Sequence, residues 1–211
     1  MKRIPTSEAA WLDNTQGLIE PDEGRRLAEL AAHVPAEWAI VEIGSHTGLS
    51  SCWLAAGSRV GYGAHVTCVD PYPMPRPGST DDPWELGPEG VLDRFKTNVS
   101  GTTQDVQRVS YWPQITMLRT TSEQAGAMWV QPIGLLFVDA IHTEAGVLAD
   151  WEAWRAHAVD VVAFHDYGDS YPGCRRGIER IAASEAWTEV GVVGSLWVAR
   201  REKGAAGPIG G

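Results

Sequence analysis

Short apolar runs alternate with helical patterns along most of this 211-residue chain. The runs typical of strands lie at 39–43, 65–70, 115–119, 133–139 and 159–166, and the patterns typical of helices at 20–34, 49–57, 91–99, 122–130, 143–157 and 173–184. Strands and helices that alternate in this way form a parallel sheet covered on both faces. The sequence therefore predicts an α/β fold with a single doubly wound, mostly parallel sheet.

The C-terminal part of the chain departs from this alternation. Residues 187–201 contain two β-rich runs on either side of Gly194 and Ser195, which predicts an antiparallel hairpin at the sheet edge. We expect an N-terminal helical segment at 1–35, a domain at 36–202 and a flexible tail at 203–211. A segment rich in proline and glycine at 71–90 interrupts the alternation, and loops of this length are usually functional.

Charge and cysteine content narrow the classes of partner. The formal net charge of -10, from 27 acidic and 17 basic residues, would repel a nucleic acid backbone. We find neither a long apolar run nor a secretory pattern, so we expect no membrane partner and a cytoplasmic location. Cys52, Cys68 and Cys174 form no CxxC pair, which argues against a disulfide framework or a zinc thiolate site.

A glycine turn follows the first predicted strand, in the sequence VEIGSHTGLSS. Gly44 and Gly48 would let a ligand approach the backbone, where the N–H groups of a helix start favour an anionic or polar group. Asp70 ends the second predicted strand, where a carboxylate can accept both hydroxyl hydrogens of a ribose. The spacing differs from the GxGxxG fingerprint of dinucleotide sites. These features favour a nucleoside cofactor over a pyrophosphate.

Polar residues also follow two later strands. Asp139 ends one strand and His142 comes three residues later, while His165 and Asp166 end the next strand. Because the carboxyl ends of parallel strands share one edge, we expect these residues to meet beside the glycine turn. Asp139 and Asp166 are hard oxygen ligands suited to magnesium, and His165 adds a nitrogen ligand. His142 is the candidate base that would deprotonate a hydroxyl activated by the metal.

Together, VEIGSHTGLSS and VTCVDPY resemble motifs I and II of class I S-adenosylmethionine-dependent methyltransferases, over roughly residues 38–200. The resemblance implies that Glu42, Gly44 and Ser45 line the methionine part of the cofactor and that Asp70 holds its ribose. The segment RTTSEQA is similar to the one that holds adenine in this family. The cofactor-binding residues predicted in this way are Glu42, Gly44, Ser45, Gly48, Ser50, Asp70, Ser122 and Asp139.

The pattern FVDAIHTEAGVLADWEAW followed by AFHDY resembles one branch of these enzymes. It is similar to the magnesium-dependent macrolide and sugar O-methyltransferases and to the cephalosporin-pathway methyltransferases. The resemblance implies that Asp139 and Asp166 are metal ligands and His142 the base, with His165 replacing one member of an acidic pair. The expected substrate is a small hydroxylated molecule, a sugar or a secondary metabolite, beneath a lid formed by 71–90. The N-terminal helix could support a homodimer.

Other interpretations stay open. An NAD-dependent dehydrogenase lacks support because the chain has no GxGxxG motif, and a metallohydrolase would leave the glycine turn unexplained. A protein that binds S-adenosylmethionine without catalysis is the third alternative. For single residues, Asp139 could do no more than cap the next helix, and His142 could be an exposed residue at the start of that helix. His165 could equally be a hydrogen-bond partner of the ligating carboxylates.

Overall fold

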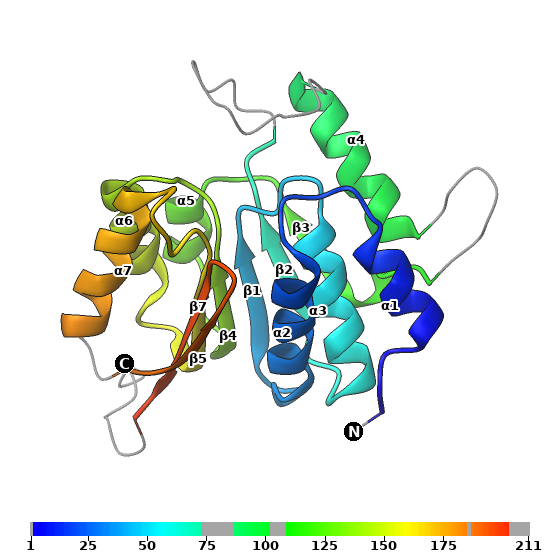
Figure 1. Cartoon of the computed structure of the whole chain (residues 1–211), viewed down its shortest axis with the longest axis horizontal. Coiled ribbons are helices and arrows are strands. Elements are labelled where there is room, and N and C mark those ends of the chain that lie inside the picture. The colour runs from blue at the N-terminus through cyan, green and yellow to red at the C-terminus, as the bar shows by residue number, and fades with distance from the viewer. Residues whose placement is uncertain (1, 73–86, 102–108, 185–186, 203–211) are drawn as a thin grey trace.

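The computed structural model describes residues 2–72, 87–101, 109–184 and 187–202. In this part of the chain, seven strands form one sheet with the order β3-β2-β1-β4-β5-β7-β6 (Figure 1). The strands are β1 (Ala39–Ile43), β2 (Val66–Val69), β3 (Ile115–Leu118), β4 (Ile133–Val138), β5 (Ala158–Phe164), β6 (Trp187–Val193) and β7 (Leu196–Arg201). The helices are α1 (Thr6–Asp13), α2 (Pro21–Ala32), α3 (Leu49–Val60), α4 (Gly87–Ser100), α5 (Ser122–Ala127), α6 (Glu144–Trp154) and α7 (Pro172–Ser184), with a 3-10 turn η1 (Trp112–Gln114).

The strand directions confirm the predicted fold class. Strands β1 to β5 are parallel, whereas β7 runs antiparallel to β5 and pairs with β6 in a hairpin. The two central strands, β1 and β4, are buried along their whole length, as short apolar runs covered on both faces should be. The carboxyl ends of the parallel strands therefore lie at one edge, where the predicted site residues follow them.

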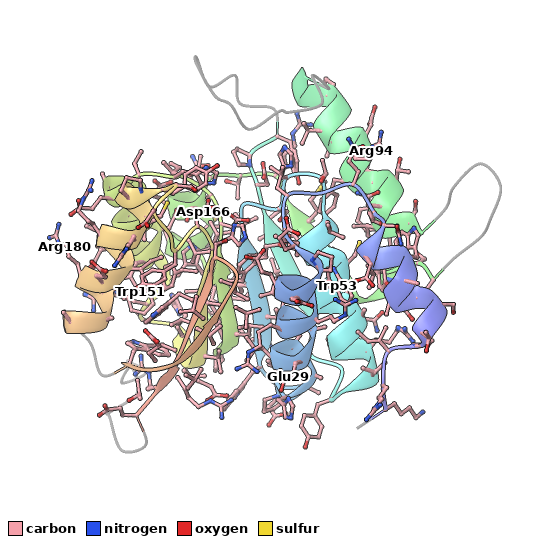
Figure 2. All side chains as sticks on the ribbon, viewed as in Figure 1. Glu29, Trp53, Arg94, Trp151, Asp166 and Arg180 are labelled. Atoms are coloured by element: carbon pink, nitrogen blue, oxygen red, sulfur yellow. The ribbon has the colours of Figure 1, made fainter. Side chains whose placement is uncertain are left out.

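Helices cover both faces of the sheet and create two separate hydrophobic cores. Successive residues of β1 alternate between these cores, with Ile40 in one and Val41 in the other. The first core contains Trp53 from α3, and the second contains Trp151 from α6 (Figure 2). Tryptophans at helical spacing are thus core residues, and the sheet is doubly wound.

The N-terminal segment predicted at 1–35 contains α1 and α2, which pack on the first face of the sheet. Helix α2 approaches α3 so closely that a Cβ on Gly57 would lie 2.1 Å from the carbonyl oxygen of Ala28. On α1, the buried carboxylate of Glu8 accepts hydrogen bonds from Arg59 and from the hydroxyl of Tyr111. These contacts hold the N-terminal helices against α3 on this face of the sheet.

Two predicted segments lie wholly or largely outside the described residues. They are the lid predicted at 71–90, of which only 71, 72 and 87–90 are described, and the tail predicted at 203–211. Among the described residues, no helix has the length and apolar character needed to cross a membrane.

Candidate active site

The turn between β1 and α3 depends on its two predicted glycines. Gly44 has a φ of 86° and Gly48 a φ of 81°, in the left-handed region that side chains disfavour. A Cβ on Gly44 would lie 2.0 Å from the carbonyl oxygen of Asp139, and a Cβ on Gly48 would lie 2.7 Å from the ring of Phe95. The turn therefore packs directly against the end of β4, where the acidic residues begin.

Asp70 holds this turn from the end of β2. Its Oδ2 accepts hydrogen bonds from the backbone N–H groups of Ser45 and His46, each at 3.1 Å, and its Oδ1 accepts one from Tyr72 at 3.2 Å. Burial raises the pKa of Asp70, and these N–H groups oppose that rise. Since each carboxylate oxygen has two lone pairs, these three bonds leave one acceptor site, on Oδ1, for a ligand.

Glu42 lies fully buried beneath the turn. Its Oε2 accepts a hydrogen bond from the hydroxyl of Ser51. Within the described part of the chain, Glu42 Oε1 and the hydroxyl of Ser45 have no hydrogen-bond partner although both atoms are buried. Burial raises the pKa of Glu42, while the hydroxyls of Ser50 and Ser51 lower it. Because buried polar atoms without partners cost free energy, the turn has unused hydrogen-bonding capacity for a ligand.

Ser122, predicted to contact adenine, begins α5, which packs with α6 in the second core. Its hydroxyl accepts a hydrogen bond from the indole Nε1 of Trp154 at 3.0 Å. The preceding residue, Thr121, caps the helix by accepting a hydrogen bond from the N–H of Gln124. Ser122 thus already helps to pack α6 against α5, a role that its place in the sequence did not indicate.

Asp139, His142 and Asp166 converge at the ends of β4 and β5. The Nε2 atom of His142 lies 3.1 Å from Asp166 Oδ2 and 3.7 Å from Asp139 Oδ1. One potential ligand atom from each of the three residues lies within 4.8 Å of the other two, a spacing that could hold a metal ion. Asp166 has a φ of 60°, and such strain in a residue other than glycine is often found at functional sites.

The sequence that contains these residues matches a known protein family. A family model described as a methyltransferase domain matches residues 41–167, which include the glycine turn, Asp70 and the acidic residues. The chain belongs to this methyltransferase family. The predicted family is thereby confirmed over more than half of the chain.

The methyltransferase also resembles solved O-methyltransferases. One is TomG from Streptomyces achromogenes, an enzyme of tomaymycin synthesis solved with S-adenosylmethionine. The two chains are 15% identical and align with a TM-score of 0.59 over 93% of this chain and 89% of that chain. This chain is also 18% identical to an O-methyltransferase from Bacillus cereus solved with S-adenosylhomocysteine, with a TM-score of 0.53 and coverage of 93% and 92%. At this level of identity, the likeness establishes a shared fold.

His165 connects the acidic residues of the methyltransferase to its N-terminal part. Its Nδ1 lies 3.4 Å from Asp139 Oδ1 and 3.3 Å from Asp166 Oδ1, while its Nε2 lies 3.0 Å from Glu23 Oε2. Ionised carboxylate oxygens only accept hydrogen bonds, so both ring nitrogens carry protons in this arrangement. Burial alone would lower the pKa of His165, but these three carboxylates raise it well above its usual value. His165 was predicted as a metal ligand, but here its ring donates hydrogen bonds to the other two predicted ligands, Asp139 and Asp166.

Glu23, which sequence reasoning missed, is the buried counter-charge of His165. Its Oε1 accepts hydrogen bonds from the backbone N–H and the hydroxyl of Ser195, at 2.7 and 2.9 Å. Burial raises the pKa of Glu23, but the hydrogen bond and charge of His165 outweigh that effect and lower the pKa to about 2. In the sequence, Glu23 has the pattern of a capping residue of α2, and it does form a capping box with Glu20. That pattern gives no sign of a contact across the fold.

The pKa of Asp139 is shifted in the opposite direction from that of Glu42. Burial alone would raise the pKa of Asp139, but the charges and hydrogen bonds of His165 and His142 hold it well below its usual range. Asp139 is therefore an ionised carboxylate at neutral pH, as a ligand for a divalent cation should be.

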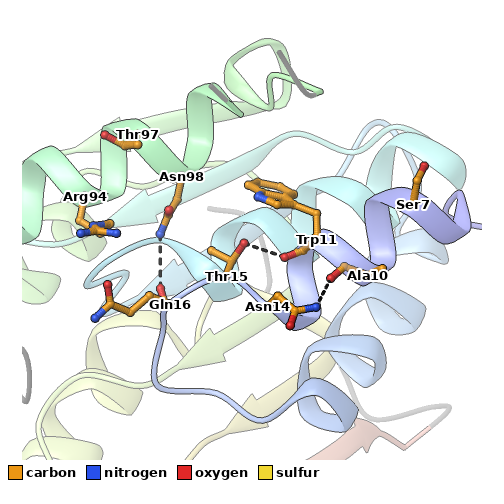
Figure 3. Close-up of a pocket in the computed structure, with 9 residues that line it drawn as sticks. All are labelled: Ser7, Ala10, Trp11, Asn14, Thr15, Gln16, Arg94, Thr97 and Asn98. Carbon is orange, nitrogen blue, oxygen red and sulfur yellow. Dashed lines mark hydrogen bonds between the residues drawn. The ribbon is translucent and has the colours of Figure 1, made fainter. Parts of the chain in front are cut away.

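A groove lies apart from the acidic cluster, between α1, the segment that follows it, and α4 (Figure 3). Its volume is about 570 Å³, and Gln16, Arg94 and Asn98 are among the residues that line it. The side-chain amide of Asn98 donates hydrogen bonds to the carbonyl oxygens of Gln16 and Thr47, at 3.5 and 2.8 Å. None of the predicted site residues lines the groove, but Asn98 connects its wall to the glycine turn.

Proposed function

We propose that this methyltransferase transfers the methyl group of S-adenosylmethionine to a hydroxyl oxygen of a small molecule, with the assistance of a divalent cation, magnesium. The observation that carries the proposal is the direct packing of Gly44 on Asp139, which joins a turn with unpartnered buried polar atoms to the acidic cluster. The cofactor's sulfonium and the acceptor's oxygen would then meet at one edge of the sheet. The C–S bond breaks as the C–O bond forms, and S-adenosylhomocysteine leaves.

The turn provides the groups that the cofactor requires. Glu42 Oε1 and the Ser45 hydroxyl would pair with the ammonium and the carboxylate of its methionine part, and Asp70 with its ribose. Gly44 and Gly48 allow the backbone to approach the ligand closely. The proposed cofactor-binding residues are Glu42, Gly44, Ser45, Gly48, Ser50, Asp70, Ser122 and Asp139.

The acidic cluster has the charge and the donor atoms for a divalent cation. Glu23, Asp139 and Asp166 contribute three formal negative charges and His165 one positive charge, which leaves two negative charges for an ion of charge +2 to balance. Asp139 and Asp166 offer the oxygen ligands that magnesium prefers. A cation bound there would lower the pKa of a coordinated acceptor hydroxyl.

His142 is proposed to remove the proton of the acceptor hydroxyl. Its side chain is 24% exposed and borders both carboxylates, so it can reach a substrate from the open side of the cluster. The ring of Tyr171 packs edge-on against the imidazole, with 4.9 Å between ring centroids, and holds its orientation. The proposed acceptor is a sugar or a secondary metabolite beneath the lid predicted at 71–90. One structural neighbour, TomG, is an O-methyltransferase involved in tomaymycin synthesis.

Calorimetry and activity measurements test this function. We expect S-adenosylmethionine to bind and NAD to show no comparable affinity. Tighter binding of NAD would refute the assignment.

Methyl transfer can be measured with a panel of small hydroxylated molecules and a cofactor labelled in its methyl group. In this assay, Asp139→Asn should abolish the dependence on magnesium together with transfer. His142→Ala should lower turnover by about 10²- to 10⁴-fold, the usual contribution of a general base, without change in cofactor affinity. Unaltered turnover in purified His142→Ala would exclude it as the base.

A further inference from the structure

One buried carboxylate joins three distant segments behind the acidic cluster. Glu23 is 2% exposed on α2, and it contacts His165 at the end of β5 and Ser195 in the turn between β6 and β7. A Cβ on Gly194 would lie 2.5 Å from Glu23 Oε1, so the hairpin closes tightly over the carboxylate. The hydroxyl of Ser195 also lies 3.1 Å from His165 Nε2. Glu23 is therefore surrounded by partners that fix its position.

We propose that Glu23 is a positioning residue that acts through His165 to hold Asp139 and Asp166 in the arrangement that accepts a divalent cation. The inference rests on the proposed function, because that function places the cation at these carboxylates. Glu23 Oε2 lies 3.0 Å from one nitrogen of His165, and the other nitrogen lies within 3.4 Å of both carboxylates. Because the imidazole ring of His165 is rigid, the position of Glu23 constrains the positions of the proposed ligands.

A purely structural role for Glu23 would need fewer contacts. Capping of α2 uses the hydrogen bond from the N–H of Glu20 to Glu23 Oε2, at 2.9 Å. The bonds from Ser195 to Oε1 and the contact with His165 add nothing to that cap. Buried ion pairs seldom stabilise a fold more than apolar contacts of equal volume, so stability alone gives no reason for this pair. Orientation of a metal ligand by an outer hydrogen bond does give one.

The charge of Glu23 has a second effect on the cluster. The imidazolium of His165 lies beside Asp139 and Asp166, where alone it would repel a cation. Glu23 balances that positive charge from the other side of the ring. The two negative charges of the proposed ligands are then left for the ion. Neutralising Glu23 should therefore weaken cation binding through both geometry and charge.

The test measures binding of Mn²⁺ by electron paramagnetic resonance in the full chain saturated with S-adenosylhomocysteine. Glu23→Gln keeps the size of the side chain and removes its charge, and we expect it to weaken Mn²⁺ affinity about 10- to 100-fold. Asp22→Asn is the matched control, because Asp22 precedes Glu23 on α2 but has a side chain that is 86% exposed. We expect the control to bind Mn²⁺ like the wild type. Calorimetry should show unchanged S-adenosylhomocysteine affinity in both variants.

The outcomes separate this inference from the proposed function. If the wild type binds Mn²⁺ and folded Glu23→Gln binds it equally well, the positioning role is wrong and the cation site stands. If the wild type binds S-adenosylhomocysteine but no Mn²⁺, the cation role and the role of Glu23 both fail. Should Glu23→Gln not fold, Ser195→Ala removes the hydroxyl contacts to Glu23 and His165. We expect several-fold weaker Mn²⁺ binding in that variant, and unchanged affinity would overturn the inference.

Discussion

The glycine turn and the acidic cluster touch at Gly44 and Asp139, yet they are built in opposite ways. Beneath the turn, Glu42 Oε1 and the Ser45 hydroxyl are buried without a partner in the described part of the chain. In the cluster, by contrast, Asp139 and Asp166 each lie against histidines. The turn therefore keeps hydrogen-bonding capacity for a ligand, whereas a cation must compete with contacts that the protein already makes.

The same contrast appears in the pKa values of Glu42, which is fully buried, and of Asp139, whose side chain is 15% exposed. Glu42 has neutral hydroxyls as neighbours, and burial raises its pKa. Asp139 has the imidazolium of His165 as a neighbour, and its pKa lies well below the usual range. Burial acts in the same direction on both groups, so the charge of the neighbours decides the outcome. The side chains around each carboxylate thus prepare one for hydrogen bonding and the other for cation binding.

The contact between the two regions should give the largest effect. Gly44→Ala places a methyl group 2.0 Å from the carbonyl oxygen of Asp139, whereas Gly63→Ala, at a similar φ of 82°, meets nothing within 4 Å. We expect Gly63→Ala to cost about 1–2 kcal/mol from backbone conformation alone. Gly44→Ala should cost about 1–3 kcal/mol more because of overpacking. Urea unfolding measures both, and equal costs would show that the two regions are not tightly packed together.

Glu42→Gln should separate the two regions functionally. Loss of a hydrogen bond to a charged group costs about 1.5–3 kcal/mol, so S-adenosylmethionine affinity should fall about 10- to 100-fold. Because Glu42 is a buried carboxylate surrounded by hydroxyls, the unliganded variant should unfold no more easily than the wild type. Calorimetry and urea unfolding test these two points. An equal fall in Mn²⁺ affinity and in cofactor affinity would show that the turn and the acidic cluster do not bind their ligands separately.

The smallest expected effect concerns acid stability. The pKa of Glu23 is lowered from 4.5 to about 2, so its stabilising contribution is present above pH 4.5 and is lost as the pH falls towards 2. Glu42 has a raised pKa, so its contribution has the opposite sign and declines as the pH rises above 4.5. Urea unfolding between these pH values should therefore show a shallower loss of stability in Glu23→Gln than in the wild type. Parallel curves would contradict the charge pairing of Glu23 with His165.

Sequence patterns predicted the sheet, the hairpin and the edge at which the site lies. The patterns succeeded because strand periodicity and glycine turns are local, and parallel strands bring their carboxyl ends together. Element ends were less accurate. The helix predicted at 122–130 ends at Ala127, because the chain must turn there to enter β4, and the indole of Trp129 donates a hydrogen bond to the carbonyl of Gln131 in that turn.

Contacts across the fold were the part that sequence could not supply. The distance from Glu23 to His165 depends on how α2 packs over the sheet, and no spacing between residues encodes it. The hydrogen bond from Trp154 to Ser122 depends in the same way on the packing of α6 on α5. Residue type and strand position therefore indicated which groups gather at the edge, while tertiary packing determines how they are paired.

The central claim is that the cofactor's methyl group and the cation lie side by side at this edge. Carbon-13 resonance of S-adenosylmethionine labelled in its methyl group, bound to the protein in the presence of Mn²⁺, tests it directly. We expect strong broadening of the bound methyl signal that an excess of Mg²⁺ reverses and that Asp139→Asn abolishes. A bound methyl signal that stays sharp at saturating Mn²⁺ would contradict the account.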